Sequence, residues 1–319
     1  KVDFEQHRIF PRRDLLHPQY FWHSVQTSRG CPFNCYFCSV SRYLGKEFRQ
    51  REVDQVLDEL SQLKGKFIAF VDDNLIGYRH NSKERATNLF KGMVEQKLNQ
   101  KWWMQTSINA ADDEKVIELA AQAGCLFAFI GFETISENTL KDMKKGVNIK
   151  MCVENYKKVL DVFHRYGIAV YGAFIIGCDY ESPEYYKEVA DFLIHSGIDI
   201  IQLTLLTPLP GTELMEDLQK EGRIIYSDYP QNWDKYRFSY MVHRPRGVKP
   251  RTIYIGNNYI KKRIYSFPAY PYRLLKSFLK LKNNTSFFAT YKFNKALKKG
   301  WQNSHYYQDY PSDLNASEE

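Results

Sequence analysis

The feature that most constrains this fold is a strand-like run followed by a helix-like run, repeated six times between residues 24 and 222. The strand candidates are rich in isoleucine, valine and aromatic residues, and several lack polar alternation, which is typical of strands covered on both faces. They span residues 24–27, 67–71, 102–108, 126–132, 168–176 and 198–207. The rhythm predicts an α/β fold with a parallel sheet and outer helices, either a barrel-like curl or a doubly wound sheet.

The segments between the strands carry helical start and stop signals. A polar residue suited to cap a helix precedes three of them, and a glycine follows each. The pairs are Asp112 with Gly124, Ser182 with Gly197, and Thr212 with Gly222. In either predicted architecture, the active site is expected beyond the C-terminal ends of the strands.

Three of the six cysteines lie close together, as Cys31, Cys35 and Cys38. A disulfide framework would spread its cysteines through the loops, whereas this grouping suits a reducing cytosol and a metal site. The CxxxCxxC spacing can place three thiolates around one iron–sulfur cubane, which leaves one iron open for a ligand. Gly30 and Pro32 suit the tight loop that such a cluster needs.

Other interpretations of the cysteines need a fourth ligand. A zinc site usually has a further Cys or His at close spacing, and an electron-transfer cluster uses four cysteines. Neither is present near residues 31–38. A catalytic three-cysteine cluster is therefore favoured over a non-catalytic iron–sulfur or zinc scaffold protein, which stays an alternative.

The cysteine motif, with Phe37 just before its last cysteine and a strand before its loop, resembles the signature of the radical S-adenosylmethionine (SAM) superfamily. The resemblance implies a partial (β/α)6 TIM-type barrel. It places this core at residues 21–225, after an N-terminal linker (1–20) and before a basic, aromatic, largely helical C-terminal extension with a frayed tail (226–319). It also implies a [4Fe-4S] cluster on the three cysteines and reductive cleavage of SAM to a 5′-deoxyadenosyl radical, which abstracts hydrogen from a substrate.

Polar residues and glycines at the predicted strand ends are the SAM contacts that the resemblance implies. Asp72 and Asp73 occupy the place of the family's Gly-Gly-Glu and retain acceptors for the SAM ammonium group. Glu133 can accept hydrogen bonds from ribose hydroxyls, and Gly177 ends a glycine-rich strand that lies near the adenine. The complete candidate set is Phe37, Asp72, Asp73, Asn109, Glu133 and Gly177.

Four segments resemble the cobalamin-associated (B12-binding-domain type) radical SAM proteins, some of which methylate unactivated carbons, including those of hopanoid-like lipids. The segments are 29–35, 70–74, 130–134 and 207–212. Members of that group carry an N-terminal cobalamin-binding domain, which is absent from this chain. Asp161, His164 and Gly167 echo a cobalamin-ligating motif, but their spacing is one residue too long, and His164 is predicted to lie on the surface. Cobalamin would therefore be held by another domain or subunit.

The net charge of +8 is unevenly distributed. Residues 235–308 contain 17 Lys and Arg and no Asp or Glu, whereas the remainder has 28 basic and 37 acidic residues. Three interpretations stay open: a solvated cover over the open side of the barrel, peripheral contact with anionic lipid through residues 243–300, and, as the least favoured, nucleic-acid binding. The stretch Arg273–Lys280 suits the lipid interface.

The leading hypothesis is a radical SAM enzyme that acts on a small-molecule substrate, with methyl transfer to an unactivated carbon, such as one in a lipid, as one outcome. It implies an electron donor such as flavodoxin or ferredoxin. The expected location is the cytoplasm or the inner membrane surface, because no apolar run approaches the roughly 20 residues of a membrane span. A tRNA methylthiotransferase-like enzyme is a second alternative, since those enzymes share the cysteine spacing.

Overall fold

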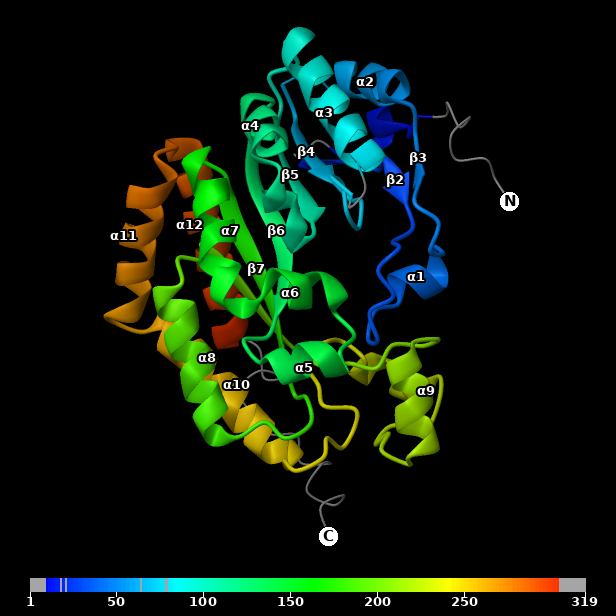
Figure 1. The fold of residues 1–319 in the computed structure, drawn as a ribbon, viewed down its shortest axis with the longest axis vertical. Helices are drawn as coiled ribbons and strands as arrows, with labels where there is room; N and C mark the ends of the chain where they lie inside the picture. The colour runs from blue at the N-terminus through cyan, green and yellow to red at the C-terminus, as the bar shows by residue number, and fades with distance from the viewer. Residues whose placement is uncertain (1–9, 18, 21, 64, 78–79, 304–319) are drawn as a thin grey trace.

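Six parallel strands form one sheet in a computed structural model that describes residues 10–17, 19–20, 22–63, 65–77 and 80–303 (Figure 1). The strands are β1 (Trp22–Val25), β4 (Phe67–Phe70), β5 (Lys101–Thr106), β6 (Cys125–Glu133), β7 (Ala169–Ile176) and β8 (Ile200–Leu205). Each overlaps one predicted strand. The first starts two residues earlier than predicted, because Trp22 and His23 pair with Phe67 and Ile68 of β4.

The sheet order decides between the two predicted architectures. The order is β1-β4-β5-β6-β7-β8, so each strand pairs with the next one along the chain. A doubly wound sheet would reverse its order at a switch point, whereas a barrel keeps adding strands in one direction. Among the described residues β1 and β8 do not pair with each other, so the barrel is partial. The predicted partial (β/α)6 barrel is confirmed.

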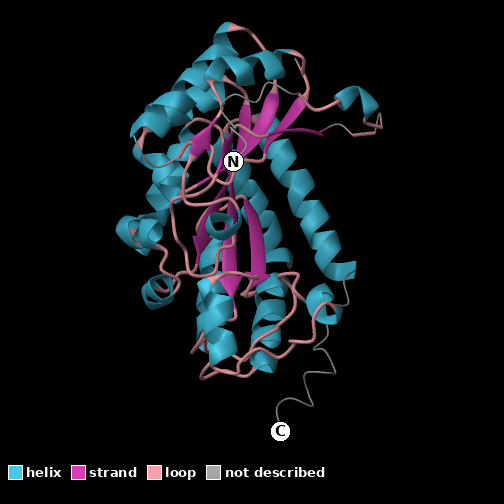
Figure 2. Ribbon diagram, turned by 90° about the vertical axis from the view of Figure 1, so that its right-hand side faces the viewer, coloured by secondary structure: helices cyan, strands magenta, loops and turns pink. Residues whose placement is uncertain are grey.

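Helices follow the strands and cover the outer face of the sheet (Figure 2). The longer ones are α2 (Val53–Ser61), α3 (His80–Glu95), α4 (Glu114–Gln122), α7 (Tyr156–Arg165), α8 (Pro183–His195) and α9 (Glu213–Lys220). Shorter helices are α1 (Val40–Tyr43), α5 (Glu137–Asp142) and α6 (Gly146–Met151). Single 3-10 turns are η1 (Arg13–Leu15), η2 (Ile108–Asp112), η3 (Val153–Asn155) and η4 (Gln231–Lys235).

Two of the three predicted helix caps are confirmed. The Ser182 side chain accepts a hydrogen bond from the Tyr185 amide, and Thr212 does the same for Met215. The third prediction is wrong by one residue. Asp112 ends the 3-10 turn η2, so the cap of α4 is its neighbour Asp113.

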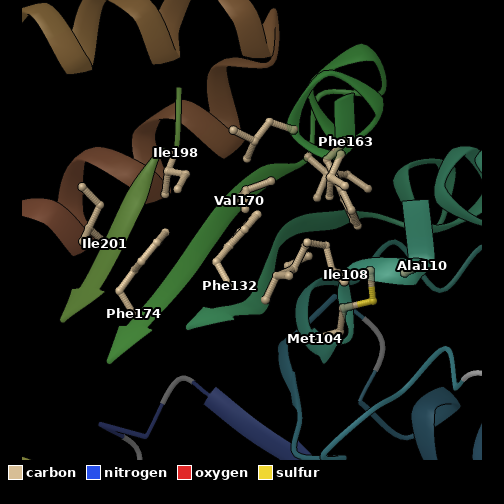
Figure 3. Packing of buried hydrophobic residues seen from close by; sticks show 14 of the residues in the cluster. Met104, Ile108, Ala110, Phe132, Phe163, Val170, Phe174, Ile198 and Ile201 are labelled. Carbon is tan, nitrogen blue, oxygen red and sulfur yellow. The ribbon is translucent and has the colours of Figure 1, made fainter. Parts of the chain in front are cut away.

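The main core lies between the sheet and the outer helices. Figure 3 shows Phe132, Val170 and Phe174 on β6 and β7, with Phe163 of α7 nearby. The rings of Phe132 and Phe174 stack with their centroids 5.8 Å apart, and all four residues are at most 1% exposed. This packing fixes the strands that carry the site at their C-terminal ends.

The basic C-terminal extension forms three helices, α10 (Pro250–Tyr265), α11 (Ala269–Leu281) and α12 (Asn284–Asn303). Their helical content agrees with the largely helical extension that the sequence analysis expects. α10 packs on α8, α11 packs on α7 and α8, and α12 contacts β6, β7 and β8. Among the described residues, no helix is long and apolar enough to cross a bilayer.

α12 occupies the inner face of the sheet, behind β7 and opposite α7 in Figure 1. Its Phe293 ring lies 5.0 Å from that of Phe127 and 6.2 Å from that of Tyr171. These two residues alternate along their strands with Phe132 and Val170, so they project from the opposite face. Of the three interpretations of the extension, a cover over the barrel is the one that this helix fits, since it packs on the inner face near the starts of the strands.

Asp199 joins the extension to the barrel and corrects one expectation. Its buried carboxylate accepts hydrogen bonds from the Val170 amide and from the Ser277 hydroxyl of α11. His164 Nε2 lies 2.8 Å from the same carboxylate, and His164 is only 4% exposed. His164 is therefore buried and paired, and the predicted surface position is wrong. Half of the predicted linker (1–9 and 18) and residues 304–319, which include the predicted frayed tail, lie outside the described residues.

Candidate metal centre

The three clustered cysteines lie on a loop that a short pair of strands closes at its base. β2 (Ser28–Arg29) pairs antiparallel with β3 (Arg49–Gln50), and residues 30–48 lie between them. Gly30 has φ +91°, and a Cβ there would lie 2.1 Å from the carbonyl oxygen of Glu47. Only glycine fits this close backbone approach, as the sequence indicates.

Cys31, Cys35 and Cys38 line one cavity of about 200 Å³ at the C-terminal ends of β4, β5 and β6. Among the described residues, their three sulfurs do not all lie within 4.8 Å of one another. Tetrahedral zinc with Zn–S bonds near 2.3 Å needs sulfurs about 3.8 Å apart. The wider spacing suits a polynuclear cluster better than one ion.

The donor set of this cavity fits a [4Fe-4S] cluster with one open iron. Among the described residues that line it, there is no fourth cysteine and no histidine. Burial raises the pKa of Cys31 to about 11 and also raises the pKa values of Cys35 and Cys38. Raised pKa values disfavour the thiolates that a cluster needs. Cationic iron counteracts this effect, because a coordinated thiol is deprotonated.

Glu133 points into this cavity because β6 is irregular at its end. The register of β6 against β7 shifts between Gly131 and Glu133, and Glu133 has φ +67°, in the left-handed region. A bulge of this kind redirects a side chain, and backbone strain often marks functional positions. A Cβ at Gly131 would lie 2.2 Å from the Glu133 carboxylate, so the missing side chain makes room for it.

Lys145 is a site residue that the sequence analysis missed. Its Nζ donates to the Glu133 carboxylate at 2.6 Å and lies 5.7 Å from the centroid of the Phe37 ring. Burial lowers the pKa of Lys145, but the carboxylate and the thiols raise it above its ordinary value. A positive charge thus sits beside the cysteines. Lys145 lies in a lysine-rich stretch whose other members face solvent, so no local pattern distinguishes it.

A second cavity, of about 300 Å³, adjoins the first along the inner face of β6, β7 and β8. Both cavities are lined by Phe37, Cys38, Phe129, Gly131 and Glu133. Most other residues that line the second cavity are apolar, including Ala173, Ile175, Leu205, Leu206 and Leu209. Gln202 and Thr204 add polar groups. The cysteines therefore lie at one end of a mainly apolar chamber.

The structure brings together Phe37, Asp73 and Glu133 with the cysteines, out of the six predicted SAM contacts. Asn74, beside Asp73, also lines the cavity, although the sequence analysis did not select it for the site. Burial and the neighbouring Asp72 raise the pKa of Asp73.

Three other predicted contacts lie elsewhere among the described residues. Asp72 is fully buried, and its carboxylate accepts hydrogen bonds from the backbone and side chain of Thr27, so it holds β1 against β4 instead of lining either cavity. Asn109 lines a neighbouring hollow, which shares Phe33 and Val147 with the cysteine cavity. The amide of Gly177 donates to Glu181, whose pKa burial raises to about 7.

Comparison with known proteins gives a consistent result. The sequence model of the Radical SAM superfamily matches residues 25–193, just over half of the chain. A bacteriochlorophyllide d C-12(1)-methyltransferase of Chlorobaculum tepidum is 35% identical over 229 residues, covering 70% of this chain and 47% of that protein. The hopanoid C-2 methylase of Rhodopseudomonas palustris is 29% identical over 215 residues, covering 66% and 40%.

A solved structure shares the fold. The cobalamin-dependent S-adenosylmethionine radical enzyme OxsB, with aqua-cobalamin bound, aligns with a TM-score of 0.60 and 18% identity. The alignment covers 91% of this chain and 52% of OxsB. The chain spans about half the length of the curated relatives that it matches.

Proposed function

Because the chain belongs to the radical SAM superfamily, we propose that it is the catalytic core of an enzyme that uses SAM to start radical chemistry on a small-molecule substrate. The observation that carries this proposal is the cavity lined by Cys31, Cys35 and Cys38, without a fourth cysteine or a histidine among its described residues. When bound, a [4Fe-4S] cluster supplies the one-electron reduction that cleaves the SAM sulfonium. An electron donor such as flavodoxin or ferredoxin is part of this proposal.

The cavity residues have the chemistry to bind the polar parts of SAM. Asp73 offers oxygen acceptors to its ammonium group, and Glu133 offers a carboxylate to its ribose hydroxyls. Lys145 offers a cation to its carboxylate once its pair with Glu133 rearranges. Phe37 supplies apolar surface between the two cavities.

The reaction that we propose is methyl transfer to an unactivated carbon of a mainly apolar substrate. The chamber beside the cysteines is lined mostly by aliphatic and aromatic side chains. Its polar groups are Ser39, Gln202, Thr204, Thr207 and the shared Glu133. Such a lining suits a lipid-like or ring-shaped molecule oriented by one or two hydrogen bonds. The named methylases among the relatives support this reaction class.

Cobalamin, if this reaction uses it, would be held by a domain or subunit outside this chain. Among the described residues, no histidine lines either cavity. His164, the histidine of the sequence that echoes a cobalamin-ligating motif, pairs with Asp199 on the outer side of the sheet. Cobalamin dependence therefore rests on the resemblance to cobalamin-dependent proteins, and methylation assays need the full-length protein.

The test is anaerobic reconstitution with iron and sulfide, followed by reduction in the presence of SAM. Wild-type protein should bind about four iron atoms, change its electron paramagnetic resonance spectrum when SAM is added, and release 5′-deoxyadenosine. Cys35→Ala should lose the SAM response and product formation. The matched control, Cys152→Ala, removes a half-buried cysteine that lines neither cavity and should behave like wild type. Stoichiometric zinc, or a cluster that SAM leaves unchanged, would contradict the proposal.

A further inference from the structure

α11 is a helix whose polar side points inward. Arg273 and Ser277 are only 5% and 4% exposed, and they donate hydrogen bonds to the backbone carbonyl and the carboxylate of Asp199. Leu275 and Leu279 lie on the opposite side and are 57% and 62% exposed. A surface helix normally turns its apolar stripe to the core. The buried side of α11 combines these two polar residues with Ala269 and Leu281, and its exposed side carries the larger apolar side chains.

The exposed side of α11 is almost entirely apolar. Tyr272, Leu275 and Leu279 follow helical spacing along one stripe, and Phe278 lies beside it. Phe267 before the helix and Phe288 of α12 are also more than half exposed. We call the four residues on the helix, Tyr272, Leu275, Phe278 and Leu279, the α11 face. Grouped exposed apolar side chains of this kind mark an interaction surface.

The extension that carries the α11 face is rich in positive charge, and the neighbouring helices α7 and α8 add Asp161, which pairs with Lys280, and Asp191, which pairs with Arg263. No Asp or Glu occurs between residues 235 and 308, where 17 Lys and Arg are found. Lys282, Lys292 and Lys295 are exposed close to it in the chain. A surface with apolar side chains at its centre and lysines around it complements a bilayer that carries anionic headgroups.

Other partners fit this surface less well. Nucleic-acid binding would use the lysines and stack bases on aromatic rings, but it would leave Leu275 and Leu279 exposed. An acidic electron carrier has to approach the cysteines, whereas α11 lies on the side of the molecule opposite α1, which directly follows the cysteine loop (Figure 1).

We infer that the α11 face docks this protein on anionic membranes, with Leu275, Phe278 and Leu279 entering the headgroup region. The docking does not depend on the cysteine cavity or on the proposed reaction. Failure of one proposal therefore leaves the other standing.

The test is sedimentation of the reconstituted protein with vesicles of phosphatidylcholine, with and without one-third phosphatidylglycerol. The test variant is Leu275→Glu with Leu279→Glu. The matched control, Leu15→Glu with Leu16→Glu, makes the same change at two exposed leucines outside the extension. Thermal melting checks that both variants fold. Wild type and control should bind the anionic vesicles, and the test variant should bind at least about tenfold more weakly, since each leucine loses an apolar contact.

Three results would overturn the inference. The first is no binding of wild type to anionic vesicles. The second is equal loss of binding in both variants, because the added negative charge, and not the loss of the apolar α11 face, would then explain the loss. The third is a wild-type dimer that only the Leu275/Leu279 variant abolishes, without vesicle binding, because the α11 face would then bind a second copy of the chain.

Discussion

At the scale of single residues, the site depends on a few side chains whose positions follow from backbone irregularities. Glu133 reaches the cysteines because β6 bulges at its end, and Gly131 leaves the space that the carboxylate fills. Lys145 then places a positive charge at the same point. Burial raises the pKa of Cys35, and Lys145 opposes that rise. The same charge should make a bound cluster easier to reduce, because reduction adds negative charge.

Replacing Lys145 should shift the reduction potential of the cluster. We expect Lys145→Met to lower it by on the order of 50 mV, which is the size of one partly buried charge acting over several ångströms. Lys145→Arg should restore most of the difference, and a redox titration followed by electron paramagnetic resonance measures it. Lys144→Met is the matched control, because Lys144 is half exposed and pairs with Glu213 instead. Equal shifts in Lys144→Met and Lys145→Met would show that the position of Lys145 beside the cysteines does not set the reduction potential.

At the scale of elements, the molecule depends on how the extension is attached to the barrel. α11 and α12 both contact the strand end that bears Asp199: Ser277 donates to its carboxylate, and Asn294 donates to its backbone carbonyl. The carboxylate also accepts from the Val170 amide. One buried residue thus satisfies polar groups from a strand and from a helix of the extension.

Asp199→Ala should destabilise the whole protein. It leaves the amide of Val170, the Ser277 hydroxyl and His164 without their acceptor, which we expect to cost on the order of 3 kcal/mol in the free energy of unfolding. Asp161→Ala is the control, because Asp161 contacts the same helix through Lys280 but is 43% exposed. That change should cost about 0–1 kcal/mol. Urea denaturation followed by circular dichroism measures both, and similar losses would argue against the role of Asp199.

At the scale of the whole molecule, the barrel core and the basic extension share one structure. The inner face of the sheet carries Phe127 and Tyr171, which contact Phe293 of α12. In the part of the chain that the structure describes, the barrel is open between β1 and β8, so its own strands do not enclose the inner face. The rings of Phe127 and Tyr171 therefore need another element to cover them. We therefore propose that the two regions of sequence on either side of the boundary at residue 225 fold together.

Residues 1–225 expressed alone should be poorly soluble. Without α12, the aromatic side chains of the inner face lose their cover and favour association between chains. Size-exclusion chromatography against the full chain tests this, and we expect most of the truncated protein to elute as aggregate. A monomer that melts cooperatively would show instead that the core folds independently of the extension.

The strands could be predicted from sequence, but the site only in part. Residues 24–207 carry apolar runs and caps that are read locally, and all six predicted strands were found. The role of Asp72 could not be predicted, because two adjacent carboxylates look alike in sequence. The loop after β4 directs Asp72 to Thr27 and Asp73 to the cysteine cavity. The bulge at Glu133 and the inward turn of Lys145 depend on contacts between distant segments.

The sequence by itself determined the parallel α/β architecture and the three-cysteine centre, because strand periodicity and ligand spacing are local properties of the chain. Only the tertiary structure decided that the strands add in one direction, that Asp73 and not Asp72 faces the cysteines, and that the basic extension fills the inner face of the sheet. It also decided that α11 turns its apolar side outward. These outcomes depend on contacts between segments that are far apart in the chain, and local sequence patterns do not specify those contacts.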